Sequence, residues 1–414
     1  MDDKKLKILL VNHSDTAGGA SVVTRRLMNA LCAEGVDARM LVVHKNTDSL
    51  RVSEAAKSRR STIPFLAEHA HIFLHNGFKR DTLFKISTAK FGLPLHRHPW
   101  VKTADVIILN WINQGMLSLK EIRRIAAEKP VVWTMHDAWN MTGVCHVLAD
   151  CERWKENECT KCPLVGRGRM AQKIFKAKKK LYDRTDIRFV AVSNRLAELC
   201  RESPLMADAN ISVIPNAFPV DKFEPVPTLS KAKMGLPETG KIIVMGAARL
   251  DDPVKNLPLA IHSLNNVGQS NLTAVFYGDL RNPEILKELT LPYIWLGRIT
   301  DHNRLQSLMA HADVVLSTSS WETLPGTLVE GISCGAVAVS TDNGGQSDII
   351  EDGVNGFIVR NTDDIPTAIQ KALSLPQDDN ARAQRHHSMA VRFGAPAVAR
   401  SYIRLCNTLL EKQG

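Results

Sequence analysis

Two carboxylates eight positions apart, Glu322 and Glu330, belong to the stretch of this sequence best suited to chemistry. The stretch, residues 317–330, reads STSSWETLPGTLVE and follows a short run rich in branched apolar residues at 312–316. Such a run is typical of a parallel strand covered on both faces, so the polar loop would lie at the carboxyl end of a sheet. Ligands of open α/β sheets bind at that edge, where the amides of the next helix favour negative charge. We expect Glu322 in a ligand-binding loop and Glu330 in the first turn of a helix.

Both acids also have ordinary structural interpretations. Thr327 and Glu330 form the T-x-x-E pattern of a capping box, which satisfies helix amides and needs no ligand. The alternative interpretation of Glu322 is an ordinary solvated acid in a loop. Taken alone, the capping interpretation of Glu330 comes first, because short motifs often match by chance. The assignment therefore depends on the rest of the chain.

Two cations follow another predicted strand, at residues 241–246. Arg249 and Lys255 lie in the loop RLDDPVKN at the carboxyl end of that strand. An arginine supplies a planar fork and a lysine a compact charge, a combination that suits a pyrophosphate. Ion pairs with Asp251 and Asp252 are the alternative.

Paired glycines follow two of the predicted strands. In the first half, strand 7–11 runs into NHSDTAGGAS, where Gly18 and Gly19 would let a ligand approach the backbone and the next helix. The loop is not G-x-G-x-x-G, so a dinucleotide-binding fold is not supported, and turn glycines explain the pair almost as well. In the second half, STDNGGQS at 340–347 offers another pair.

A histidine and an acid, His136 and Asp137, stand just beyond the apolar strand predicted at 131–135. A ligand cleft would open at such a strand end. A neutral imidazole there could hydrogen-bond a sugar hydroxyl or accept a proton. For an isolated pair of this kind, a structural hydrogen bond is the favoured interpretation.

Half of the eight cysteines fall within eighteen residues. They are Cys145, Cys151, Cys159 and Cys162, and the last two form a Cys-x-x-Cys pair. Clustered thiolates in a cytoplasmic chain favour structural zinc over disulfides, with a reduced cysteine-rich loop as the equal alternative. We expect no catalytic metal, because no open coordination site is implied.

These candidate residues need a scaffold of alternating strands and helices, and the sequence predicts one in each half. Strands are predicted at 7–11, 39–43, 106–109, 131–135 and 188–193, then at 241–246, 273–278, 293–296, 312–316, 336–340 and 356–359. An amphipathic helix is predicted at 20–34, ending at Gly35, and a last helix around 397–410. Residues 45–100 are too irregular to assign. The alternation implies doubly wound α/β lobes with parallel sheets.

Composition agrees with a globular chain of two domains. The 414 residues exceed one ordinary core, and 44% hydrophobic with 23% charged residues does not indicate disorder. No apolar run approaches a membrane span and no signal-peptide layout precedes the first strand, so a cytoplasmic protein is expected. The net charge of +10 favours an anionic partner. The basic stretch 173–182 is interpreted as a solvated helix face, with a patch for peripheral membrane contact as the alternative.

Together these positions resemble the retaining glycosyltransferases of family 4, which have the GT-B fold. That fold consists of two Rossmann-like parallel-sheet lobes facing a central cleft, with a C-terminal helix crossing back to the first lobe. The resemblance covers almost the whole chain and implies four segments: an acceptor-side lobe at 1–214 with the cysteine-rich insert 145–162, a linker at 215–232, a donor-binding lobe at 233–390 and the returning helix at 391–414. The segment HDAWNMTGVCHVLADCERWKENECTKCP further resembles a subgroup linked to bacterial exopolysaccharide assembly, including colanic-acid-type enzymes.

The resemblance assigns roles to the candidate residues. Glu322 and Glu330 match the family's E-x7-E element, in which the first acid touches the donor sugar and the second the ribose hydroxyls. Arg249 and Lys255 match the pair that neutralises the donor pyrophosphate, Gly18 and Gly19 the glycine-rich loop, and His136 the cleft histidine. The donor-binding loop implied between the acids comprises Thr323, Leu324, Pro325, Gly326 and Thr327, with Thr323 standing where an aromatic residue is usual.

The implied reaction moves a sugar from a nucleotide-sugar donor to a saccharide or polyprenyl-linked saccharide acceptor, with retention of configuration. The sequence has no Asp-x-Asp triplet, so donor binding is expected to need no metal. A donor phosphate oxygen would act as the base. Two alternatives remain: a nucleotide-sugar epimerase of the same fold, and a zinc-stabilised nucleic-acid-binding protein. Specific nucleic-acid binding is not expected, since aromatic residues hardly interleave the basic stretch.

Overall fold

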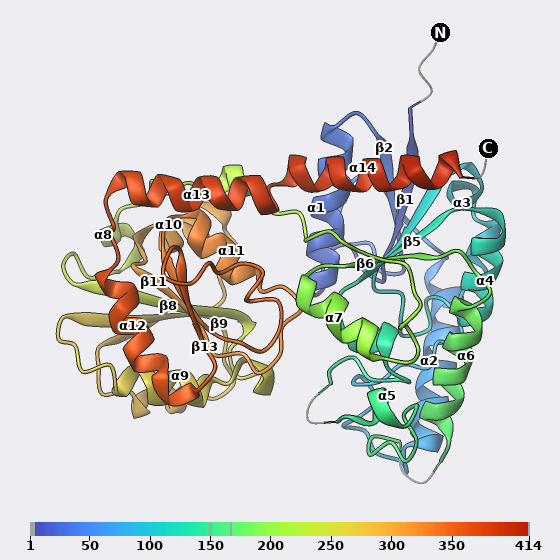
Figure 1. Cartoon of the computed structure of the whole chain (residues 1–414), viewed down its shortest axis with the longest axis horizontal. Helices are drawn as coiled ribbons and strands as arrows, with labels where there is room; N and C mark the ends of the chain where they lie inside the picture. Colours follow the sequence, from blue (N-terminus) through green and yellow to red (C-terminus); the bar gives the residue numbers. More distant parts are fainter. Residues whose placement is uncertain (1–4, 149–150, 166–167, 413–414) are drawn as a thin grey trace. The chain divides into compact units, whose positions relative to one another are not determined.

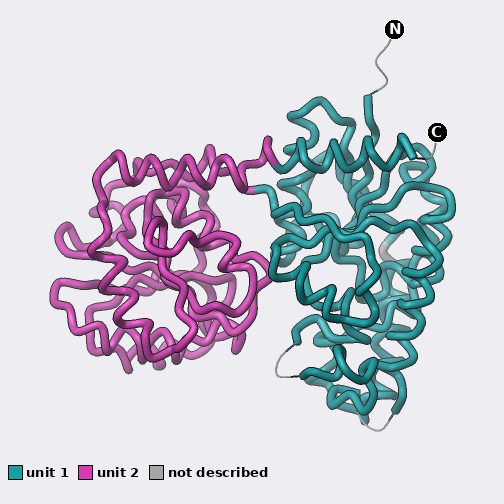
Figure 2. Tube along the Cα trace, in the orientation of Figure 1, with its two compact units in different colours: residues 1–217, 398–414 teal, residues 218–397 magenta. Residues whose placement is uncertain are grey.

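The computed structural model describes residues 5–148, 151–165 and 168–412, shown along the chain in Figure 1. The chain divides into two compact units, coloured separately in Figure 2. Unit 1 takes residues 1–217 together with 398–414, and unit 2 takes residues 218–397. Each unit has its own parallel sheet, so each is described by itself.

Unit 1 is built on a sheet of seven parallel strands in the order β3-β2-β1-β4-β5-β6-β7. The strands are β1 (Lys7–Val11), β2 (Asp37–Val42), β3 (Val52–Glu54), β4 (Val106–Leu109), β5 (Val131–Met135), β6 (Arg188–Ala191) and β7 (Ile211–Val213). The central strands β4 and β5 are buried along their whole length, as expected when both faces of a sheet are covered. The strand order reverses between β1 and β4, and such a switch point is where ligands bind in doubly wound folds.

Helices connect the strands of unit 1. They are α1 (Gly19–Ala33), α2 (Ser58–His75), α3 (Pro99–Thr103), α4 (Leu119–Glu128), α5 (Arg153–Glu156), α6 (Met170–Tyr182) and α7 (Asn194–Glu202), with short 3-10 turns at Leu95–Arg97 and Ala138–Met141. Just beyond α1, Gly35 has a φ of 88°, which suits the glycine that commonly terminates a helix. No helix in the described ranges is both long and apolar enough to cross a membrane.

The last helix, α14 (Ala395–Glu411), packs on unit 1 from Val398 onward. Its buried side includes Tyr402, whose hydroxyl lies 2.9 Å from Thr134 Oγ1 on β5. Arg400 of the same helix forms an ion pair of 3.1 Å with Glu34 at the end of α1. The predicted return of the C-terminal helix to the first lobe is confirmed.

Unit 2 is built on six parallel strands in the order β10-β9-β8-β11-β12-β13. They are β8 (Lys241–Arg249), β9 (Leu272–Asp279), β10 (Tyr293–Trp295), β11 (Val314–Ser317), β12 (Val337–Thr341) and β13 (Gly356–Val359). The helices are α8 (Lys231–Met234), α9 (Leu257–Asn265), α10 (His302–His311), α11 (Gly326–Ser333), α12 (Ile365–Ser374) and α13 (Asp379–Phe393), with 3-10 turns at Val220–Lys222, Pro253–Lys255, Pro283–Glu288 and Thr362–Asp364. Apolar residues of β8, β9, β11, β12, α9 and α12 form one core.

Three features differ from the sequence expectations. The short edge strands β3 and β7 were not predicted, because their sequences, VSE and ISV, each contain a serine and form no apolar run. The segment expected as a linker packs on unit 2: Gln306 Nε2 donates to the carbonyls of Glu224 and Val226 at 2.6 and 2.9 Å. The basic stretch on α6 is not simply a solvated face, because Lys178 is fully buried.

Candidate functional site

The loops that follow β8 and β11 are hydrogen-bonded to each other at the carboxyl edge of the unit 2 sheet. The two strands are parallel neighbours, so their ends come together. Ser320 N donates to Val254 O at 2.8 Å, and Thr318 Oγ1 lies 3.0 and 3.1 Å from the carbonyls of Lys255 and Asn256. The structure therefore brings two of the predicted loops into one assembly.

Lys255 and Glu322 meet within this assembly. The Lys255 ammonium contacts Glu322 Oε1, and Ser319 Oγ donates to the same oxygen at 3.0 Å. Both side chains keep some exposure, 29% for Lys255 and 18% for Glu322. The pair therefore presents a cation and an acid, with fixed partners, at the strand ends.

The loop after β12 holds Glu322 from the other side. Gly345 N donates to Glu322 O at 3.0 Å, and Thr341 Oγ1 donates to Ser319 O at 2.8 Å. Gly344 has a φ of 156°, and a Cβ added there would lie 1.8 Å from Glu322 O. Only glycine fits this position, so the glycine pair noted in the sequence shapes the Glu322 loop.

Gln346 is a residue at this edge that sequence reasoning missed. Its side chain is fully buried, yet neither amide atom has a hydrogen-bond partner in the part of the chain that the structure describes. Its Oε1 would lie 3.2 Å from a Cβ on Gly344. Buried polar groups are almost always paired, so an unpaired amide beside the Glu322 loop marks a position where a ligand could supply the partner.

Arg249, the other predicted pyrophosphate ligand, lies at the end of β8 and pairs locally. Its Nε lies 3.0 Å from Asp251 Oδ1, close enough for an ion pair but without hydrogen-bond alignment. The side chain is 41% exposed, so this pair costs little to rearrange. Asp252 accepts from Val254 N at 3.1 Å and shapes the turn that carries Lys255.

The capping-box interpretation is wrong. Helix α11 begins at Gly326 with Pro325 as its N-cap residue, so Thr327 lies inside the helix and caps nothing. Glu330 is correspondingly beyond the first turn, contrary to expectation, and is 9% exposed. The remaining residues of the predicted donor loop lie between β11 and this helix: Thr323 is half-buried, and Leu324 and Pro325 are buried.

Glu330 acts electrostatically on buried groups of unit 2. Burial raises the pKa of the Tyr277 phenol well above its ordinary value, and the nearby Glu330 carboxylate raises it further. Gly246 on β8 makes room for that ring, because a Cβ there would lie 1.7 Å from Tyr277 Cε1. Tyr277 therefore stays a neutral phenol.

In unit 1, Gly18 and Gly19 lie where β1 passes into α1. Gly18 is the N-cap residue with a φ of 86°, which favours glycine, whereas Gly19 is the first helical residue. A Cβ on either would meet nothing within 4 Å, so the backbone here is open. The preceding Asp15 is buried and accepts from Asn46 N and from Thr47 N and Oγ1, which ties the glycine loop to the chain after β2.

His136 follows β5 and lies against Asn110 at the end of β4. Asn110 Nδ2 donates to Ile108 O at 3.3 Å, which orients the amide so that Asn110 Oδ1 accepts from His136 Nε2 at 2.9 Å. Burial lowers the pKa of His136 to about 4, with the Asp137 charge opposing the shift only in part. The imidazole is neutral near pH 7, as a hydroxyl acceptor must be.

Asp137 pairs with His146 rather than with His136. His146 Nδ1 lies 2.6 Å from Asp137 Oδ2, and His146 Nε2 lies 2.9 Å from Ser87 Oγ. Burial alone raises the pKa of Asp137, but His146 and the donors from Trp139 and Trp111 outweigh it and hold the pKa below its ordinary value. Ser87 is 1% exposed, so the hydrogen bonds that join Asp137, His146 and Ser87 fix the chain after β5 to a buried part of unit 1. Ser87 lies 59 positions before His146, so no local sequence pattern could indicate this contact.

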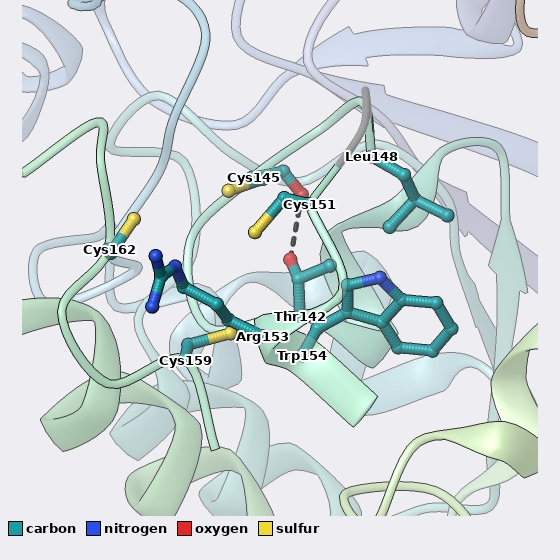
Figure 3. A pocket seen from close by; sticks show the side chains of 8 residues that line it. All are labelled: Thr142, Cys145, Leu148, Cys151, Arg153, Trp154, Cys159 and Cys162. Atoms are coloured by element: carbon teal, nitrogen blue, oxygen red, sulfur yellow. Dashed lines mark hydrogen bonds between the residues drawn. The ribbon is translucent and has the colours of Figure 1, made fainter. Parts of the chain in front are cut away.

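The four clustered cysteines line one small cavity in unit 1 (Figure 3). All eight cysteines of the chain are free thiols. Within the described ranges, no group of three or more His, Cys, Asp or Glu side chains is positioned to hold a metal ion as it stands.

Comparison with known families agrees with this architecture. Residues 17–222 match the model of Glycosyltransferase Family 4, and residues 228–388 match that of Glycosyl transferases group 1. The two matches together cover most of the chain, the first lying mainly in unit 1 and the second in unit 2.

Solved structures share the fold along nearly the whole chain. A glycosyltransferase from Rickettsia africae aligns with a TM-score of 0.65 at 15% identity, covering 98% of this chain and 99% of that one. Alr3699/HepE from Anabaena, solved in complex with UDP and glucose, aligns at 0.62 and 18% identity, covering 97% and 100%. Identities this low show the fold alone. The predicted GT-B fold is confirmed.

Curated relatives match over shorter stretches. An Escherichia coli K12 protein named as the colanic acid biosynthesis glycosyl transferase WcaC is 30% identical over 105 residues, which is 25% of each chain. A phosphatidylinositol N-acetylglucosaminyltransferase subunit from Arabidopsis thaliana is 25% identical over 195 residues, 44% of this chain and 42% of that one. The chain thus spans less than half the length of these relatives.

Proposed function

We propose that this protein is a retaining glycosyltransferase that moves a sugar from a nucleotide-sugar donor to a saccharide acceptor carried on a lipid. The contact between Lys255 and Glu322 carries the proposal, because it places a cation and an acid together at the strand ends of the group 1 domain. The two family matches and the neighbour solved with UDP and glucose support a nucleotide-sugar donor.

Such a site must above all stabilise the leaving group, because the nucleoside diphosphate departs with negative charge. Lys255 would stabilise this charge as a point cation, and Arg249, once released from Asp251, would add a bidentate fork. Glu322 would hydrogen-bond the donor sugar and Glu330 the ribose. These groups bind and orient the donor without a metal ion.

The acceptor hydroxyl would attack on the face that the diphosphate leaves, with a donor phosphate oxygen taking its proton. Configuration at the anomeric carbon is then retained. In unit 1, neutral His136 would hydrogen-bond a sugar hydroxyl, and the glycine loop at Gly18 would admit the ligand to the backbone. The relationship to WcaC supports a role in bacterial exopolysaccharide or related cell-surface glycan synthesis.

A panel of nucleotide sugars, screened for slow release of nucleoside diphosphate, tests the proposal without the acceptor. One donor of the panel should be hydrolysed well above the background rate, and the Lys255→Met variant should lose this activity. Interconversion of nucleotide sugars without release of nucleoside diphosphate would instead identify an epimerase and overturn the transferase.

A further inference from the structure

Four cysteines of unit 1 surround a cavity sized for a single ion. Cys145, Cys151, Cys159 and Cys162 line it together with Thr142, Leu148, Arg153 and Trp154 (Figure 3). Its volume is about 20 Å³. A cavity needs roughly 10–15 Å³ to hold one water molecule, so there is room for one small ligand and no more. Half of the chain's cysteines line this small cavity, and such a cluster needs a chemical explanation.

A backbone amide donates to one of these sulfurs. Gly143 N donates to Cys159 Sγ at 3.1 Å, and Val165 N donates to the carbonyl oxygen of Cys162 at 3.3 Å, which fixes the turn. Amide donors stabilise a thiolate relative to a thiol. The Cys-x-x-Cys turn that carries both residues is also specially shaped, since Cys159 and Lys161 have φ values of 60° and 50°. Such backbone is unfavourable for side-chain-bearing residues and persists where the surroundings fix it.

A buried lysine stands beside the sulfurs without a carboxylate partner. Lys178 is fully buried on α6, and its Nζ donates to the carbonyls of Trp139 and Thr142 at 2.5 and 3.0 Å. Among the described residues, no carboxylate lies within ion-pair distance of this ammonium. The Asp137 carboxylate attracts this ammonium from beyond ion-pair distance, and further negative charge nearby would stabilise the buried cation. A zinc ion held by four thiolates carries a net charge of −2 and supplies it.

We propose that Cys145, Cys151, Cys159 and Cys162 bind one Zn²⁺ ion as a closed site and that Lys178 is its buried countercation. Four protein ligands leave no open position, so the ion stabilises structure and takes no part in sugar transfer. The sulfurs must draw together around the ion, since they are not arranged as a metal site in this structure. The site fixes the chain after β5 against α6, because the carbonyls that Lys178 binds belong to that chain.

Metal analysis of the full chain, purified under reducing conditions, is the first test. About one zinc per chain is expected, released as four thiols react with a mercurial reagent. Replacement by Co²⁺ should give the visible absorption of a tetrahedral thiolate site. Zinc-free protein with all eight thiols reactive would overturn the proposal, and so would a disulfide between Cys145 and Cys162 in protein kept reduced until alkylation.

Matched variants test the assignment of ligands and countercation. Cys159→Ser and Cys162→Ser should lose zinc, whereas Cys32→Ser, outside the cluster, should keep it. Lys178→Met should weaken zinc binding roughly 10- to 100-fold in chelator competition, as loss of outer-shell partners typically does. Lys179→Met, at the next position of α6, should bind zinc like the wild type. Equal zinc affinity in Lys178→Met and wild type would remove the role of Lys178. The cobalt spectrum of wild-type protein decides the matter even if a cysteine variant fails to fold.

Discussion

The Lys255 ammonium contacts the Glu322 carboxylate across 67 positions of sequence, joining the loops that follow β8 and β11. If the protein has the proposed function, a diphosphate that binds Lys255 competes with Glu322 for the same cation. A charge pair of this kind fixes the positions of both side chains, but its carboxylate also competes with an anionic ligand for the cation. The two residues should therefore respond differently to substitution.

Lys255→Met should lose both donor binding and transfer, because it removes the charge that meets the diphosphate. Glu322→Gln should lose transfer by about 10²- to 10³-fold while binding nucleoside diphosphate at least as tightly as the wild type. Calorimetric titration with the nucleoside diphosphate and a transfer assay measure the two effects. Near-normal transfer by either variant with a confirmed donor would contradict the assigned roles.

The exposed pair Lys287 and Glu284 provides the control for this experiment. It is also a Lys–Glu contact of unit 2, but both side chains are more than two-thirds exposed. Lys287→Met should leave donor binding and transfer unchanged, since exposed ion pairs contribute little.

Gly344→Ala should disrupt the Glu322 loop, because the new Cβ would lie 1.8 Å from Glu322 O. The comparison is Gly353→Ala, where φ is 76° but a Cβ meets nothing within 4 Å. Gly353→Ala should cost only the roughly 1–2 kcal/mol of a left-handed residue. Gly344→Ala should destabilise the protein more and abolish transfer. Urea denaturation and the transfer assay compare them, and equal behaviour of the two variants would argue against the loop contact.

Gln346→Met should stabilise the free protein by about 1 kcal/mol or more, since it removes two buried unpaired polar atoms. If the amide serves the donor, the same variant should raise the KM for the donor. Gln306 is the matched control: it is equally buried but donates to two carbonyls, so Gln306→Met should destabilise. A loss of stability in Gln346→Met would show that the amide already has partners.

Stability should fall as the pH is lowered from about 6.5 toward 4, because burial lowers the pKa of His136 to about 4. In this window the unfolded chain binds a proton at His136 and the folded chain does not, so each pH unit removes up to about 1.4 kcal/mol. Above the window both states are neutral at this residue and the contribution is constant. Urea denaturation at pH 7 and pH 5 should show a smaller difference for His136→Gln than for wild type. His387→Gln, at an exposed histidine of unit 2, should keep the full difference.

Much of the fold could be read from the sequence. Strands β1, β4, β5 and β13 have the predicted limits, because a short apolar run bounded by other residues shows where a strand begins and ends. The edge strands β3 and β7 of unit 1 could not be found, because each has only three residues of mixed polarity and forms by pairing with a neighbour. The start of α11 was also misplaced, because Thr327 and Glu330 fit the capping-box pattern although the helix begins at Gly326, with Pro325 at the N-cap position and no side-chain cap.

The sequence by itself determined which residue types stand at the strand ends: Lys255 and Glu322 in unit 2, and His136 in unit 1. Only the tertiary structure decided their partners, because pairing across parallel strands brings together loops that are tens of residues apart. In the structure, Lys255 pairs with Glu322, whereas Arg249 pairs with Asp251. The tertiary structure also buries Lys178 beside the cysteines. The charges along α6 could not indicate this, because only packing distinguishes a buried lysine from its solvated neighbours.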